Sequence, residues 1–197
     1  MRKDGIKTFH AKTVDNWRHW LASNHRKESS LWLIIYKKSS NVPSVTYREA
    51  VDEALCFGWI DSKPNKRDDQ SYYQFFSRRN PRSNWSKINK EKVARLSAAG
   101  RMAPPGLEMV ALAKASGTWA ALDNVDKLVI PEDLQVSFRH YNNAEENFNK
   151  FPKSVKRGIL EWILTAKKPE TRNKRIEETT RLAADNIRAN QYISKRA

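Results

Sequence analysis

Residues 46–61 read Thr-Tyr-Arg-Glu-Ala-Val-Asp-Glu-Ala-Leu-Cys-Phe-Gly-Trp-Ile-Asp. Thr46 and Glu49 have the spacing of a capping box, in which a hydroxyl and a carboxylate bind exposed backbone N–H groups at a helix start. Apolar residues then recur on one helical face, and Gly58 is typical of a helix end. The chain turns directly into Trp59-Ile60-Asp61, so this stretch predicts a helix followed by a strand and favours an α+β fold.

The flanking residues predict further helices and strands. The apolar run at residues 31–38 is typical of a central strand, and the aromatic residues 72–76 predict a second strand in a small antiparallel sheet. Residues 62–70 are polar and predict a loop. Helical spacing predicts helices over residues 14–24, 87–99 and 107–115, with a break at Ala103-Pro-Pro-Gly106.

Beyond about residue 126 the strand signals vanish. Val155, Ile159, Trp162 and Ile163 form an apolar stripe, and Pro169 both ends that helix and opens the next. We therefore expect an α+β domain over residues 1–125, with a small antiparallel sheet and packed helices, and an all-helical module over 126–197. The stripes are covered either by the first domain or by another copy, so the oligomeric state is open.

The composition excludes several classes of protein. The chain has 197 residues and a single cysteine, which rules out an internal disulfide framework or a thiolate-rich metal cluster. Neither a metal site nor a cofactor is predicted, because the glycine-rich phosphate loops and the usual zinc and hydrolase motifs are absent. No apolar run reaches the roughly 18 residues of a membrane-spanning helix, and the N-terminus lacks a secretory signal. We expect a cytoplasmic protein.

The net charge of +15 is concentrated in the first half of the chain. The densest stretch runs from Arg78 to Arg101, where Glu91 is the one acidic residue. A field of this sign attracts phosphates, nucleic acid or anionic lipid headgroups. Two interpretations follow: a nucleic-acid-binding surface on the Arg78–Arg101 segment, or a charged surface that keeps the protein soluble.

Residues 76–87 interleave arginines with hydroxyls and an indole. Arginine matches phosphate and carboxylate in a bidentate fashion, and a helix start after Ser86 would offer free backbone N–H groups. This pattern predicts a site for an anionic small molecule or phosphate-bearing ligand, formed by Trp59, Asp61, Arg78, Arg79, Ser83, Trp85, Ser86 and Lys87. In the alternative, Trp85 belongs to the core, Ser83 or Ser86 caps a helix, and the arginines are solvated or pair with Asp61 and Glu53.

Cys56 and Asp61 are the candidates for catalysis. Cys56 is a nucleophile only if an imidazole lies near it in space, and it is otherwise a small buried apolar residue. Asp61 is either a general base or the partner of an arginine. No catalytic residue is assigned, and enzymatic activity stays an open alternative.

Several of these motifs occur together in one family. They include Ser44-Val-Thr-Tyr-Arg-Glu-Ala50, Glu53 to Asp61, Arg82 to Asn89 and, most specifically, Ala166-Lys-Lys-Pro-Glu-Thr-Arg172. In this the chain resembles the YdeI/OmpD-associated, or bacteriocin-protection, family from about Val14 to Ala184. The resemblance implies an association with resistance to cationic antimicrobial peptides and bacteriocins, but no reaction, cofactor or catalytic residue. A protein of charge +15 repels a cationic peptide. We therefore expect an indirect role in resistance or stress, through an anionic ligand or a regulatory target.

Overall fold

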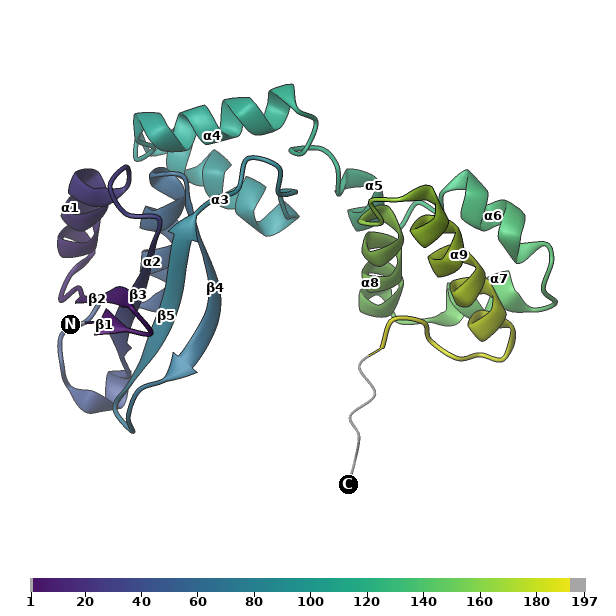
Figure 1. The fold of residues 1–197 in the computed structure, drawn as a ribbon, viewed down its shortest axis with the longest axis horizontal. Helices are drawn as coiled ribbons and strands as arrows, with labels where there is room; N and C mark the ends of the chain where they lie inside the picture. Colours follow the sequence, from purple (N-terminus) through teal and green to yellow (C-terminus); the bar gives the residue numbers. More distant parts are fainter. Residues whose placement is uncertain (1, 192–197) are drawn as a thin grey trace. The chain divides into compact units, whose positions relative to one another are not determined.

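A computed structural model describes residues 2–191 and divides the chain into two compact units. Unit 1 comprises Met1–Ala121 and unit 2 comprises Leu122–Ala197. In Figure 1 unit 1 is coloured from purple to teal and unit 2 from green to yellow. Among the described residues, no helix is long and apolar enough to cross a membrane.

Unit 1 is built on a five-stranded sheet with the order β1-β2-β3-β5-β4. The strands are β1 (Arg2–Lys3), β2 (Ile6–His10), β3 (Ser30–Tyr36), β4 (Trp59–Lys66) and β5 (Ser71–Arg78). Strands β2 and β3 pair in parallel, and the other pairs are antiparallel. The sheet is thus mixed rather than antiparallel as expected. Helix α1 (Val14–Asn24) connects β2 to β3, because parallel neighbours need a crossover connection.

The prediction of a loop over residues 62–70 was wrong in its first half. Strand β4 continues through these residues to Lys66 as the last strand of the sheet. Its side chains from Ser62 to Lys66 are exposed, and polar residues are common in a strand at the edge of a sheet. Pro64 follows an irregularity in the pairing with β5, where a missing N–H is tolerated. Polar composition here marks an edge strand.

The helices of unit 1 contribute buried side chains to a single core that they share with the sheet. They are α1, α2 (Tyr47–Cys56), α3 (Lys87–Ala98) and α4 (Pro104–Ala115), with a short 3₁₀ turn at Lys38–Ser40. The capping box at the start of α2 is confirmed, since Thr46 and Glu49 exchange both hydrogen bonds. Helix α4 begins at Pro104, inside the expected break, because a proline is well placed in a first helical turn.

Unit 2 is helical throughout its described part. Its helices are α5 (Asp123–Asp126), α6 (Glu132–Phe138), α7 (Ala144–Lys150), α8 (Lys153–Leu164) and α9 (Pro169–Ala184). Leu134, Phe148, Ile159 and Ile163 form the centre of a separate core. The predicted α+β fold with a C-terminal region of helices is confirmed.

Candidate anion-binding site

A pocket of about 390 Å³ lies in unit 1, where four parts of the chain meet. These parts are the end of α1, the turn from α2 into β4, the segment after β5, and one face of α4. The polar lining consists of His25, Arg26, Arg78, Arg79 and Glu108. The pocket therefore combines three arginines and an imidazole with a single carboxylate.

The other wall of the pocket is apolar. It consists of Phe57, Pro81, Pro105, Met109 and Leu112. A volume of this size, with apolar walls and a few polar groups, is typical of a site for a small molecule.

Two glycines allow α4 to approach the end of α2 closely. Gly58 adopts a φ of +72°, and a Cβ there would lie 2.8 Å from Cγ of Met109. A Cβ at Gly106 would lie 2.2 Å from the carbonyl oxygen of Cys56. The apolar wall of the pocket therefore rests on backbone contact between α4 and the α2–β4 turn.

Arg79 is the central polar residue of the pocket. Arg79 is only 4% exposed. Its Nη2 donates a hydrogen bond of 2.6 Å to the carbonyl oxygen of Asn84. Its Nε and Nη1 are buried without a hydrogen-bond partner, and no carboxylate among residues 2–191 pairs with it. Burial lowers the pKa of Arg79 to about 10. The guanidinium is thus a buried cation with unused donors.

His25 supplies a second unpartnered atom. It follows the last turn of α1, and its Nδ1 lies 3.0 Å from the carbonyl oxygen of Leu21. Its Nε2 is buried without a partner. The indole of Trp59 donates to the backbone carbonyl of His25, and the His25 ring lies 5.7 Å from that of Phe57. The imidazole is thus held from two sides.

The structure brings only some of the predicted site residues together. Arg78 and Arg79 line the pocket, and Trp85 lies behind Arg79 in the core. Trp59 is fully buried and reaches the pocket only through its bond to His25. His25, Arg26 and the α4 residues were not predicted from the sequence, because their positions are set by contacts distant in sequence.

The other predicted residues have structural partners. Asp61 accepts a hydrogen bond of 2.6 Å from the hydroxyl of Tyr47. Ser83 bonds Asn80 within a turn, and Ser86 is the N-cap of α3. Lys87 lies 3.9 Å from Glu91 on the surface of that helix. The structure thus gives Ser86 the capping role of the alternative interpretation.

Three basic residues of the Arg78–Arg101 segment are bound to carboxylates of α2. Lys92 and Arg95 pair with Asp52 at 3.4 and 2.6 Å, and Arg101 pairs with the buried Glu53. Arg18 binds the other oxygen of Glu53 at 2.7 Å. These contacts fix α3 and α1 against α2 and leave less of the segment available to a nucleic acid.

Cys56 lies in the core and has the properties of a buried apolar residue. Burial, reinforced by the charge of Glu53, raises the pKa of its thiol to about 11. A thiolate is therefore strongly disfavoured. Within the described residues, no group of three or more histidine, cysteine or acidic side chains is arranged to hold a metal ion.

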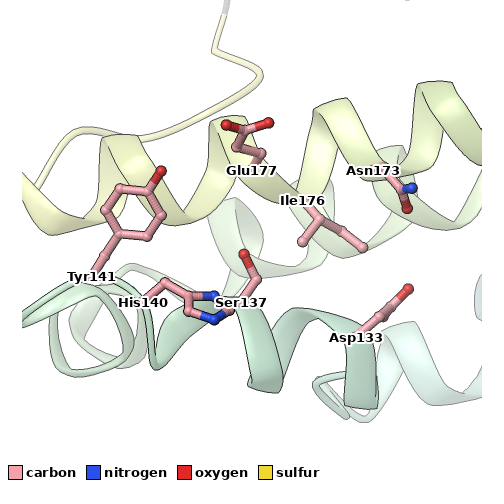
Figure 2. A pocket seen from close by; sticks show the side chains of 7 residues that line it. All are labelled: Asp133, Ser137, His140, Tyr141, Asn173, Ile176 and Glu177. Carbon is pink, nitrogen blue, oxygen red and sulfur yellow. The ribbon is translucent and has the colours of Figure 1, made fainter.

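Unit 2 has a shallow groove between α6 and α9 (Figure 2). Asp133, Ser137 and His140 come from the α6 side, and Asn173, Ile176 and Glu177 come from α9. Asp133 already binds Arg172 through two hydrogen bonds of 2.6 and 3.0 Å, and Ser137 bonds Thr180. Because Asp133 and Ser137 have partners, the groove offers a ligand fewer unpaired polar groups than the pocket of unit 1 does.

These features define an α+β protein with a helix-covered mixed sheet and a separate helical unit. The chain belongs to the family described as Domain of unknown function (DUF8412), whose model matches residues 9–109. Residues 127–186 match the family model described as Bacteriocin-protection, YdeI or OmpD-Associated, which confirms the resemblance for that part of the chain. No curated protein and no solved structure matches the chain.

Proposed function

We propose that this protein binds a small organic oxyanion, a carboxylate or a phosphate ester with an apolar body, in the pocket of unit 1. The observation that carries the proposal is the burial of Arg79 with two nitrogens unpaired. A buried charge without a partner is costly unless another charge or hydrogen bond compensates it. An oxyanion supplies both, and arginine binds carboxylate and phosphate through strong charge-assisted hydrogen bonds.

The rest of the lining supports an anion with an apolar portion. Arg26 and Arg78 are exposed at the rim, where they add positive charge and attract the ligand. Phe57, Met109 and Leu112 lie on the apolar side. An inorganic ion would leave that side empty, so an aryl or alkyl group attached to the anion fits the pocket better.

We further propose that the protein works in the cytoplasm and that its role in resistance or stress is indirect. The charge of +15 disfavours direct capture of a cationic peptide. The bound anion, or a target that responds to it, is then the agent of protection.

A thermal-shift experiment tests the binding proposal. The ligands are phenyl phosphate, benzoate, inorganic phosphate and a short oligonucleotide, each at low and high salt. Phenyl phosphate and benzoate are expected to stabilise the wild-type protein in a saturable way and more strongly than inorganic phosphate. Arg79→Met is expected to lose the shift, whereas Arg82→Met, which removes an exposed arginine outside the pocket, keeps it.

The same experiment decides against the proposal if the shifts survive in Arg79→Met or if neither organic anion shifts the melting temperature. A shift with the oligonucleotide alone, lost at high salt, would instead support the nucleic-acid alternative.

A further inference from the structure

The contact made by His25 determines which of its ring nitrogens carries hydrogen. Nδ1 lies 3.0 Å from the carbonyl oxygen of Leu21, and a carbonyl oxygen only accepts hydrogen bonds. Nδ1 is therefore the donor. In the neutral imidazole, Nε2 then holds a lone pair. Nε2 is also the ring atom of His25 that is buried without a hydrogen-bond partner, and His25 lines the pocket.

Arg79 and His25, which both line the pocket, thus carry two opposite kinds of buried, unsatisfied atom. Nε and Nη1 of Arg79 only donate, whereas Nε2 of a neutral His25 only accepts. A fully ionised oxyanion can accept hydrogen bonds from Arg79. Its oxygens cannot donate to Nε2, so lone pairs of the ligand and of Nε2 would face each other and repel. One proton placed between Nε2 and an oxygen of the ligand removes this conflict.

We infer that the pocket binds its oxyanion together with one proton, held between Nε2 of His25 and a ligand oxygen. This inference rests on the proposed function. A phosphate monoester brings the proton itself in its singly protonated form, because its second pKa is about 6. A sulfate ester or a carboxylate brings no proton of its own, so with these ligands His25 takes up the proton from water. Near neutral pH the pocket therefore favours a phosphate monoester with an apolar ester group.

The charged groups around His25 do not themselves make ligand binding depend on pH. Arg26 comes from the end of α1, Arg78 and Arg79 from the end of β5, and Glu108 from α4. Arginines keep their charge between about pH 5.5 and 8.5, and an ordinary carboxylate titrates below this range. Uptake of a proton by the imidazole is the change of charge on which the dependence rests.

Phenyl sulfate isolates the contribution of His25, because its single charge does not change in this pH range. Isothermal titration calorimetry measures its affinity for the wild type, His25→Gln and the matched control His19→Gln. His19 lies in α1, the helix that His25 follows. Its Nδ1 makes the same kind of bond, 2.8 Å from the carbonyl oxygen of Asp15, but it lies outside the pocket.

The wild type and His19→Gln are expected to lose affinity above pH 7, with a slope that approaches tenfold per pH unit. In His25→Gln the affinity is expected to be independent of pH, because an amide donates to the anion without taking up a proton. Titrations of the wild type at pH 8 in buffers of different ionisation enthalpy need no variant, and they should show uptake of about one proton per ligand.

Constant affinity across the pH range, without proton uptake, would overturn the inference and leave the anion site intact. Absence of binding by phenyl sulfate and phenyl phosphate at every pH would overturn the proposed function instead. A wild-type slope that persists in His25→Gln would assign the proton to another group.

Discussion

The guanidinium carbon of Arg79 lies 3.8 Å from the centroid of the Trp85 ring. Trp85 is itself buried and packs against Trp119 at 5.0 Å. An aromatic face attracts a guanidinium but does not neutralise its charge. The stack therefore fixes the position of Arg79 and keeps its charge available to a ligand.

Replacing Arg79 with methionine is expected to stabilise the unliganded protein while it removes ligand binding. Methionine fills a similar volume beside Trp85 and removes a buried cation that has no carboxylate partner. Substitution of buried charges by apolar groups often raises the free energy of unfolding, here by about 1 kcal/mol. Urea denaturation at neutral pH measures the change.

Arg82→Met serves as the control for Arg79→Met. Because Arg82 is exposed, the free energy of unfolding of this variant should hardly differ from that of the wild type. A marked loss of stability in Arg79→Met would show that the arginine is structural rather than held in place for a ligand.

Substitution of Gly106 by alanine tests the contact between α4 and the end of α2. The added methyl would lie 2.2 Å from the carbonyl oxygen of Cys56, which is backbone and cannot rotate away. We expect a loss of about 3 kcal/mol in the free energy of unfolding. Gly158→Ala in α8 is the matched control, because nothing lies within 4 Å of the new methyl. Alanine is the better helix former, so this control should gain about 0.5 kcal/mol. Equal effects at the two glycines would contradict the close approach.

Cys56 is expected to resist thiol reagents in the folded protein. Its raised pKa of about 11 leaves a thiolate fraction on the order of one in a thousand at pH 8, and its side chain is buried. Ellman's reagent should therefore report almost no thiol until urea unfolds the protein, and then one thiol per chain. Rapid stoichiometric labelling of the folded protein would restore Cys56 as a candidate nucleophile.

The bond from Tyr47 to Asp61 predicts a loss of stability at alkaline pH. Burial, with the hydrogen bond and charge of Asp61, raises the pKa of Tyr47 from 10.0 to about 12. Because folding raises this pKa, Tyr47 contributes to the free energy of unfolding. The contribution is complete below pH 10 and declines as the pH rises towards 12. Tyr47→Phe should lack this contribution and show a flatter decline between these pH values.

Urea midpoints at pH 9 and pH 11 measure that difference for the wild type and Tyr47→Phe. Tyr141→Phe, which removes a hydroxyl from unit 2, is the control and should follow the wild type. If Tyr47→Phe and the wild type decline in parallel, the bond to Asp61 does not contribute.

Features set by residues close in sequence were predictable, and features set by distant residues were not. The capping box at Thr46 and Glu49 was predictable because both hydrogen bonds join residues three positions apart. The parallel pairing of β2 with β3 was not, because it depends on partners on either side of α1. The continuation of β4 beyond Asp61, as far as Lys66, was mistaken for a loop because an edge strand exposes polar side chains as a loop does.

The pocket shows the same division. Arg78 and Arg79 were identified as candidates because clustered arginines near a capped helix start form a local pattern. His25 was passed over because no histidine lies near Cys56 in sequence. Its place in the pocket follows from packing of α1 against the α2–β4 turn, through the bond from Trp59 and the contact with Phe57.

Every residue that lines the pocket lies between His25 and Leu112, within unit 1. N-terminal domains generally fold first during synthesis, while the ribosome adds about 5 to 20 residues per second. Unit 1 can therefore close its pocket before the helices of unit 2 are complete. A ligand that binds only the folded form stabilises it by mass action. Under the proposed function, the supply of the anion during synthesis would therefore influence how much of unit 1 stays folded.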